Sequence, residues 1–507
     1  MRLIICLLIA SLSAAAPGGP PVEERIHAAW LGQILGTLMG FQFEHKTASV
    51  ERVESIPGRA IEAAPVDDDY YYELVALRAF ERYGPSLTIE QLGRQWLENN
   101  AGTWGASKHA RLNMERGIAA AEAGSPRYNP MWFSIGPQFS ADIYGMLAPG
   151  RPNLAAHLAR RLGAINGHAE GLDGGVFVAG MVSLAFVENR PDRVVEGAAQ
   201  LVAKGSSYRE CLDEVISMAR AGKSFREVAD AVERRWHRDY PATNNAVANG
   251  GLTAASVWFG QGDFLETVNL AFAAGDFTDA DCNAANAGAV VGSMKGLQAI
   301  PPALREALHD RIKGEKLGDL PVRPAVDEPI SGIARRIAVL APRIAAAHPE
   351  LLSPRPRALP LQRFKQADLM QWWNPEWSLE RAGFGGGLGG MTGLRGATYL
   401  DGETLVTWPE AEARGLLLRR KLTPKSGDVV SVEIRADQGR HWQLEIYAGN
   451  QRILGRLIDE NWQTVSVPLD SRAGKPTEIR IYQRINLTGN LIASSAHWRR
   501  LTVGPGK

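Results

Sequence analysis

Two carboxylates at the start of a small-residue segment could hold a metal ion. Within Gly275–Gly296, Asp279 and Asp281 lie one residue apart, and Cys282 and Asn283 follow directly. Buried carboxylates are costly unless a cation or hydrogen bonds compensate their charge. We therefore interpret Asp279 and Asp281 as metal ligands. The alternative is an acidic helix N-cap, because Asp is favoured at helix starts.

A second acidic stretch could supply further ligands. Asp67, Asp68 and Asp69 follow Pro65 and Val66, immediately before a predicted helix over residues 70–83. One Asp there would simply be a cap, but three adjacent carboxylates repel each other unless a cation neutralises them. Exposed Asp runs also occur in solvated loops, so this alternative stays open on the sequence alone.

Glycines at a spacing of four predict two thin helices that would position these acids. Gly288, Gly292 and Gly296 share one helical face, and Gly32, Gly36 and Gly40 share another, with Glu44 next in the same spacing. A glycine face lets another backbone approach closely. We expect a helix over residues 23–44, and close packing of these helices would carry the acidic loops into the interior of a helical domain.

Two further polar segments lie between the acidic stretches. Residues 138–145 begin at Gln138 and contain Asp142 among apolar neighbours. Residues 166–175 form a predicted glycine-rich loop with His168, before a predicted helix over residues 176–186. A lone His is more often a hydrogen-bonded structural residue than a ligand. The sequence contains no HExxH, CxxC or GxSxG motif, so zinc protease, zinc finger and serine hydrolase functions lack support.

Composition is ordinary for a globular protein, and the N-terminal segment predicts export. The 507 residues carry a net charge of +1, with 45% hydrophobic and 22% charged residues, so no global field attracts nucleic acid. Residues 1–18 resemble a signal peptide, too short for a comfortable membrane span, which predicts a secreted or periplasmic protein. Cys6 would leave with it. Cys211 and Cys282 make no disulfide framework, although one bridge between them stays open.

The hydrophobic period divides the chain into two parts. Helical periodicity dominates residues 22–350, a Pro- and Arg-rich linker covers 351–364, and alternating residues in 365–507 predict a β-sandwich or jelly roll of galactose-binding type. Trp442, Trp462 and Trp498 are candidates for its core. Trp372, Trp373 and Trp377 could stack on sugars, but we favour a role in sealing the linker against the helical domain. The GxGxxG match at residues 385–390 follows no strand and opens no helix, so dinucleotide binding is discarded.

These motifs, taken in order, resemble the ADP-ribosylglycohydrolase family, which includes dinitrogenase reductase-activating glycohydrolase. Its G-D-A-L-G-x-x-x-E pattern corresponds to residues 36–44, with Thr37 in place of Asp. Its [S/T]-D-D-T pattern corresponds to residues 67–70, with Asp67 and Tyr70 at the outer positions. Its D-T-D-[T/S/C]-N-A-A pattern corresponds to residues 279–285, with Ala280 replacing Thr. Residues 138–145 and 167–179 resemble central segments of secreted or uncharacterised members.

The resemblance implies an all-α orthogonal helical bundle with two divalent cations, Mg²⁺ or Mn²⁺, at the bottom of a cleft. It implies hydrolysis of a glycosidic bond at C1 of an ADP-ribosyl or related sugar, with Glu44 orienting water or moving protons. The same fold acting on another exported glycoside, and a silent carbohydrate-binding protein, are the alternatives. The expected partner is a small molecule or glycan, without nucleic acid or stable membrane insertion; the oligomeric state is not predicted. Predicted metal ligands are Asp67, Asp68, Asp69, Asp279, Asp281 and Cys282, and predicted substrate contacts are Gln138, Asp142, His168 and Asn283.

Overall fold

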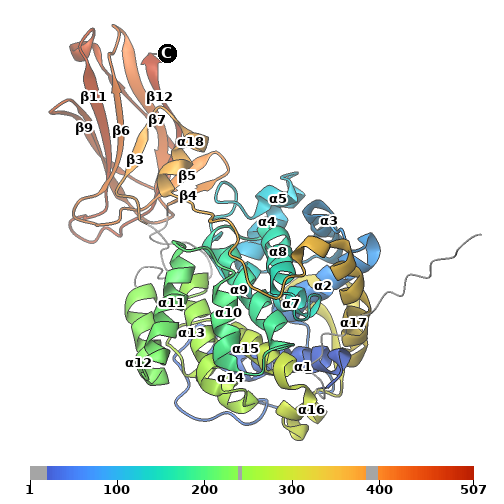
Figure 1. The fold of residues 1–507 in the computed structure, drawn as a ribbon. Coiled ribbons are helices and arrows are strands. Elements are labelled where there is room, and N and C mark those ends of the chain that lie inside the picture. The colour runs from blue at the N-terminus through green and yellow to red at the C-terminus, as the bar shows by residue number, and fades with distance from the viewer. Residues whose placement is uncertain (1–19, 238–242, 384–397, 507) are drawn as a thin grey trace, which may run out of the picture.

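The computed structural model describes residues 20–237, 243–383 and 398–506. The predicted signal peptide with Cys6 and the glycine run at 385–390 lie outside these ranges. Figure 1 shows a helical part followed by a separate β part. Each part has its own buried apolar cluster, so the predicted order of a helical bundle and then a β-sandwich is confirmed.

The helical part is built largely as the hydrophobic period predicts. Its helices are short to medium in length, and several begin at a side-chain cap: the Asp67 carboxylate accepts from the Asp69 N–H at 3.1 Å, and Thr88 and Gln91 form a capping box. The helix that follows Asp67 ends at Tyr83 and is capped by Gly84, whose φ of +85° suits a glycine. The helices are α1 Val22–Gly40, α2 Asp68–Tyr83, α3 Ile89–Asn99, α4 Gly105–Glu115, α5 Ala120–Ala123, α6 Gly136–Phe139, α7 Asp142–Met146, α8 Pro152–Leu162, α9 Glu170–Ala185, α10 Pro191–Ala199, α11 Ser207–Arg220, α12 Phe225–Val232, α13 Ala246–Gly260, α14 Phe264–Phe272, α15 Ala280–Lys295, α16 Pro302–Ala307 and α17 Ile330–Ala347.

The glycine faces of α1 and α15 pack against each other. A Cβ on Gly36 would lie 2.4 Å from the Ala284 backbone oxygen, and a Cβ on Gly32 would lie 2.3 Å from that of Gly288. Only a residue without a side chain permits this approach. Helix α1 ends at Gly40 and a 3-10 turn follows at Phe41–Phe43, so Glu44 lies just beyond the helix instead of extending its glycine face.

One β-hairpin interrupts the helices, which the sequence analysis did not predict. Strands β1 Arg311–Leu317 and β2 Leu320–Pro329 pair antiparallel and precede α17. Helix α9 also begins at Glu170, earlier than predicted. Its first turn lies against neighbouring backbone, since a Cβ on Gly171 would be 2.5 Å from the Trp132 oxygen. None of the helices in the described ranges combines the length and apolar character needed to cross a bilayer.

The β part consists of two antiparallel five-stranded sheets, with strand orders β10-β7-β12-β5-β4 and β3-β6-β11-β8-β9. Trp442 and Trp498 meet in its core with ring centroids 4.8 Å apart. Trp462 is only partly buried and lies beside Arg499, so its prediction as a core residue is wrong. The elements are α18 Leu369–Trp373, β3 Ser378–Glu380, β4 Tyr399–Asp401, β5 Thr404–Thr407, β6 Leu416–Leu422, β7 Asp428–Arg435, β8 Trp442–Ala448, β9 Gln451–Ile458, β10 Gln463–Pro468, β11 Thr477–Arg484 and β12 Ala496–Pro505.

The segment between the two parts is hydrogen-bonded to the helical part. Asn153 donates to the backbone oxygens of Ser353 and Arg355 and accepts from the Arg357 N–H. The three tryptophans divide their roles: Trp377 is buried in the sandwich, and the Trp373 indole N–H donates to the Glu403 backbone oxygen. Trp372 stacks on Phe364, which in turn contacts Trp132 of the helical part. Of the three tryptophans, Trp372 alone contacts the linker in the way that the predicted seal against the helical part requires.

Candidate metal centre

The N-terminus of α2 presents the first group of acids. Asp69 is completely buried, and its Oδ2 accepts a hydrogen bond from the Thr37 hydroxyl of α1 at 2.8 Å. Its Oδ1 has no partner among the described residues. Asp67 and Asp68 are partly buried beside it. One of the three acids therefore caps the helix, while Asp69 points a free oxygen into the interior.

Asp279 and Asp281 at the start of α15 form the second group. Each is 5% exposed, and the Oδ1 atom of each lacks a partner among the described residues. Asp279 occupies the N-cap position but makes no side-chain cap hydrogen bond. The capping role proposed as an alternative therefore does not account for its carboxylate.

A buried amide network fixes this loop. The Asn249 side-chain oxygen accepts from the Asp279 N–H at 3.1 Å and from the Asn283 amide at 2.8 Å. The Asn283 oxygen in turn accepts from the Thr253 hydroxyl at 3.1 Å. Asn283 is fully buried, so the contacts that it makes are structural. Asn249 and Thr253 were not found by the sequence analysis, because helix α13 carries no recognisable motif there.

The two acidic groups meet although they are far apart in the sequence. Ligand atoms of Asp69, Asp281 and Cys282 lie within 4.8 Å of one another, as do those of Glu44, His45 and Asp279. Two backbone hydrogen bonds hold the Glu44 loop beside the Asp279 loop, from the His45 N–H to the Thr278 oxygen and from the Phe277 N–H to the Lys46 oxygen. The fold thus gathers acids from three segments.

The electrostatics of this cluster call for positive charge. Burial, followed by repulsion from neighbouring carboxylates, raises the pKa of Asp68 and Asp281 well above the ordinary value, and the pKa of Asp69 is raised in the same way. Burial, and then Asp279, raises the pKa of Glu44 to about 7. A divalent cation would remove this repulsion. Carboxylate oxygens are the ligands that Mg²⁺ and Mn²⁺ prefer, so the residues present fit such an ion.

Cys282 lies in this cluster but differs from the acids in its chemistry. Burial and the surrounding carboxylates raise the pKa of its thiol well above the ordinary value. Without a bound cation the thiol is therefore protonated. Its Sγ lies within 4.8 Å of ligand atoms of Asp69 and Asp281, so Cys282 stays a predicted ligand. Cys211 is also a free, buried thiol, so the disulfide that the sequence left open is not formed.

Asp142 and Gln138 lie in the interior behind the acids. Asp142 is completely buried, and its Oδ2 accepts from the Asn286 amide at 2.6 Å and from the Gln33 amide at 3.3 Å. Gln33 also donates to the Asp69 backbone oxygen at 3.1 Å. The Gln138 side-chain oxygen accepts from the Tyr208 hydroxyl at 3.0 Å. Both predicted substrate contacts are therefore engaged with protein groups.

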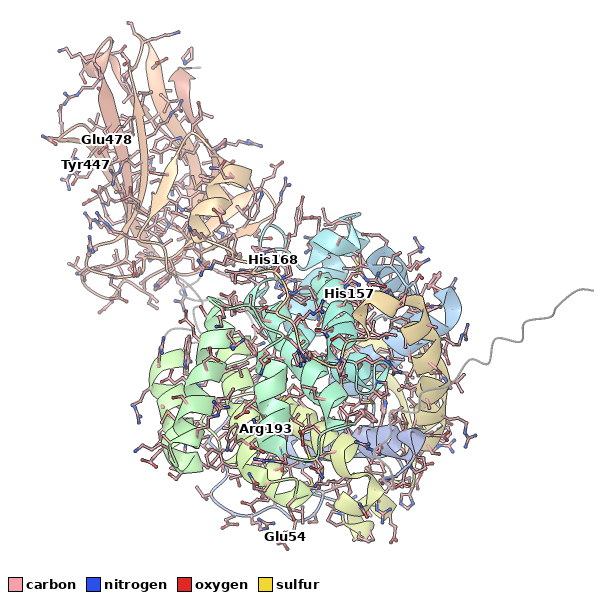
Figure 2. The ribbon with its side chains drawn as sticks, in the orientation of Figure 1. Glu54, His157, His168, Arg193, Tyr447 and Glu478 are labelled. Carbon is pink, nitrogen blue, oxygen red and sulfur yellow. The ribbon has the colours of Figure 1, made fainter. Side chains whose placement is uncertain are left out.

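His168 lies at the side of the helical part that is nearer to the β part, as Figure 2 shows. Its Nδ1 is 3.0 Å from the Gln362 amide of the connecting segment, and its ring meets Trp132 edge-on. Burial and Arg160 lower its pKa to about 4. The contacts of His168 thus join it to the connecting segment and not to the carboxylates.

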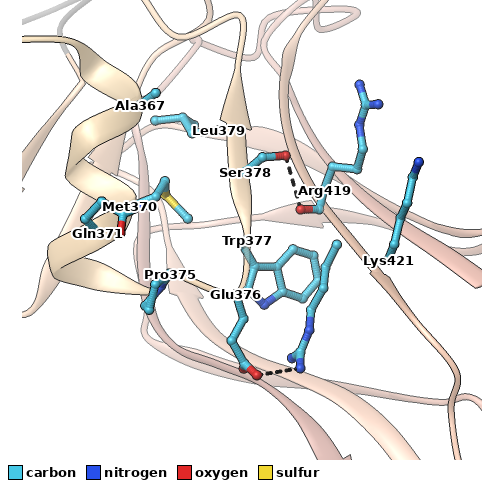
Figure 3. Close-up of a pocket in the computed structure, with 11 residues that line it drawn as sticks. Ala367, Met370, Gln371, Pro375, Glu376, Trp377, Ser378, Leu379, Arg419 and Lys421 are labelled. Carbon is cyan, nitrogen blue, oxygen red and sulfur yellow. Dashed lines mark hydrogen bonds and ion pairs between the residues drawn. The ribbon is translucent and has the colours of Figure 1, made fainter.

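The β part carries a separate surface pocket of about 470 Å³, drawn in Figure 3. It lies between α18 and the edge formed by β3 and β6. Arg419, Arg420 and Lys421 line it. Arg419 pairs with Glu380 at 2.6 Å and Arg420 pairs with Glu376 at 2.7 Å. Further lining residues are Ala367, Met370, Gln371, Pro375, Trp377, Ser378 and Leu379.

Comparison with known proteins identifies the helical part. The profile of the ADP-ribosylglycohydrolase family matches residues 19–338, which is more than half of the chain. No curated protein matches the sequence. A solved structure described as an ADP-ribosylglycohydrolase-related protein complex has 17% identity and a TM-score of 0.44, and the match covers 63% of this chain and 99% of that one.

Two other solved structures match with lower TM-scores. One, described as "CBM4 structure and function", has 16% identity and a TM-score of 0.19 over 26% of this chain and 89% of its own. The other, a GH115 4-O-methyl-α-glucuronidase with specificity for decorated arabinogalactans, has 11% identity and a TM-score of 0.18 over 70% of this chain and 42% of its own. Structural similarities at these scores assign neither fold nor function. On the match of the family profile, the chain belongs to the ADP-ribosylglycohydrolase family.

Proposed function

We propose that this protein is a divalent-metal-dependent hydrolase that cleaves the glycosidic bond at C1 of an ADP-ribosyl or related sugar group. The observation that carries the proposal is the convergence of acids from two distant motifs. Asp69, Asp279 and Asp281 each carry a buried oxygen without a partner among the described residues, and ligand atoms of Asp69 and Asp281 lie within 4.8 Å of each other. Unpartnered buried carboxylates are strongly destabilising, so their retention points to an ion that they hold.

Asp67, Asp68, Asp69, Asp279 and Asp281 would hold two Mg²⁺ or Mn²⁺ ions. When bound, such ions polarise sugar hydroxyls and lower the pKa of a coordinated water. Thr37 would keep the Asp69 carboxylate in position through its 2.8 Å hydrogen bond, and Asn249 would fix the Asp279 loop. Hydrogen-bond partners of this kind orient metal ligands and raise the affinity of the site for the metal.

Glu44 is the candidate acid–base group. Its side chain is 34% exposed, unlike those of Asp69 and Asp281, so it can reach a water or a substrate hydroxyl. In the metal-free fold, burial and Asp279 raise its pKa to about 7. Cations bound beside it would lower this pKa and favour the carboxylate form, which accepts a proton from the attacking water.

An exported glycosidase of the same fold is the second candidate. It is favoured by residues 1–18, whose sequence supports secretion or delivery to the periplasm, and by the appended β-sandwich. The charged pocket beside β3 and β6 could contact a glycan, whereas a purely structural module needs no such pocket. Retention of polysaccharides by the full-length protein, compared with an Arg420→Ala and Lys421→Ala double variant, distinguishes these roles.

A hydrolysis screen tests the proposed reaction. ADP-ribosylated arginine, O-acetyl-ADP-ribose and a panel of aryl glycosides would be incubated with the protein in Mg²⁺, Mn²⁺ or EDTA. We expect turnover of at least one C1-linked substrate, loss of turnover in EDTA, and loss in Glu44→Gln with metal binding retained. Turnover that persists in EDTA would refute the metal dependence, and a strict preference for hexosides would favour the second candidate.

A further inference from the structure

A strained turn lies at the edge of the acid cluster. It covers residues 275–278, directly before Asp279. Phe277 in this turn has a φ of +54°, which lies in the left-handed region. Glycine adopts this region freely, whereas a residue with a Cβ is strained there, and a bulky aromatic residue is a genuine outlier.

Contacts with the chain that follows Glu44 hold the turn in this conformation. The Phe277 N–H donates to the Lys46 backbone oxygen at 2.5 Å. The Asp276 carboxylate accepts from the Ala48 N–H at 2.8 Å. A left-handed non-glycine residue persists only where its surroundings determine its conformation, and such residues cluster at functional sites. The strain at Phe277 therefore calls for a functional explanation.

The facing loop carries the same kind of strain. His45 has a φ of +53°, and its N–H donates to the Thr278 backbone oxygen at 2.8 Å. Ligand atoms of Glu44, His45 and Asp279 lie within 4.8 Å of one another. His45 and Phe277 thus border one acidic group, from the two loops that carry its members.

The Phe277 side chain lies at the surface of this border. It is 54% exposed, whereas Thr278 beside it is buried. Two residues of chain span at most about 7 Å, so the Phe277 Cα lies within that distance of the Asp279 Cα. Exposure of an aromatic ring to water and left-handed strain both oppose folding, so local stability does not explain a phenylalanine at this position.

We propose that Phe277 is a specificity-determining residue, whose ring packs against a flat apolar face of the substrate beside the bond at C1. Two parts of a substrate offer such a face, the C–H face of its sugar ring and an aryl leaving group. An aromatic side chain gives either face a large contact area. The role rests on the proposed function, because it concerns the substrate of the same site.

Phe277→Gly separates this role from a structural one. It removes the ring together with the strain, so the melting temperature should be unchanged or higher, because relief of strain offsets the greater freedom of glycine in the unfolded chain. The KM for the substrate that the hydrolysis screen identifies should rise about 10-fold, as expected for the loss of one ring contact, with little change in kcat. Phe277→Tyr keeps the ring and should keep the KM of the unsubstituted protein.

Methyl and phenyl glycosides of the same sugar, used as competitive inhibitors, locate the contact. Weaker inhibition of the Phe277→Gly variant by both glycosides would place the ring against the sugar. Weaker inhibition by the phenyl glycoside alone would place it against the leaving group. Either result supports the proposal.

Arg500→Gly is the matched control. Arg500 of β12 has a φ of +48° and an exposed side chain, so this substitution relieves the same strain in the β part and should leave KM unchanged. An unchanged KM in Phe277→Gly would overturn the proposal, and so would a higher KM with a lower melting temperature, which indicates a structural role. Absence of turnover in the unsubstituted protein would instead overturn the proposed function, and this role with it, so the two failures are distinguishable.

Discussion

At the scale of single residues, the Thr37 hydroxyl supports the metal site through Asp69. Thr37→Val removes the 2.8 Å hydrogen bond while preserving shape, and should weaken metal binding by about 10–100-fold. Thr37→Ser keeps a hydroxyl and should restore most of the affinity. Isothermal titration with Mn²⁺ measures both variants. If the Thr37→Val variant bound Mn²⁺ as tightly as the unsubstituted protein, Thr37 would not support the metal site.

The carboxylate of Asp281 has a more direct role. Asp281→Asn replaces a charged oxygen ligand with a neutral group of nearly the same shape. It should abolish turnover together with the rise in melting temperature that Mg²⁺ or Mn²⁺ gives by mass action. Differential scanning fluorimetry over a metal titration measures this response. An unchanged metal response in the variant would show that Asp281 is not a ligand.

Protonation of Glu44 predicts how the metal-free protein responds to pH. Its pKa is raised in the fold from 4.5 to about 7, so the folded state binds protons more tightly than the unfolded state. The resulting stabilisation is complete below pH 4.5 and is lost as the pH rises through about 7. Urea unfolding in EDTA should therefore show falling stability from pH 5 to pH 8. Glu44→Gln should make this fall shallower, and rising stability over that range would contradict the assignment.

At the scale of elements, the α1–α15 contact carries the site, because α15 begins at the Asp279 loop and α1 supplies Thr37. Gly36→Ala would place a Cβ 2.4 Å from the Ala284 oxygen, a rigid backbone atom. We expect a loss of about 1–3 kcal/mol in the free energy of unfolding and weaker metal binding. Gly455→Ala is the control, since its Cβ would meet its nearest atom at 3.6 Å. Equal stability of the two variants would contradict the close packing.

The sequence was informative about elements wherever local chemistry decided the structure. Glycine spacing predicted the close helices, Asp67 predicted the start of α2, and alternation predicted strands such as β7 and β8. It failed for the β1–β2 hairpin, because prolines and charged residues obscure the alternation of its few buried side chains. Tertiary contacts, such as that of Asn249 with the Asp279 loop, leave no pattern in the local sequence. The sequence alone also cannot distinguish Trp462, which is only partly buried, from a core tryptophan.

At the scale of the whole molecule, two separate apolar cores predict independent folding of the β part. Residues 365–507 should unfold cooperatively by themselves, monitored by the fluorescence of the packed Trp442 and Trp498. Trp442→Ala should destabilise this fragment by about 3–5 kcal/mol. A fragment without a cooperative transition would show that the sandwich needs the helical part.

The central claim is that acids from two distant motifs form one metal centre, and anomalous scattering tests it most directly. Crystals of the full-length protein soaked in Mn²⁺ would be measured on both sides of the manganese absorption edge. We predict anomalous peaks in contact with Asp69 and Asp281, and their absence in Asp281→Asn crystals. Saturating Mn²⁺ without a peak between α2 and α15, or with the same peak in the variant, would contradict this account.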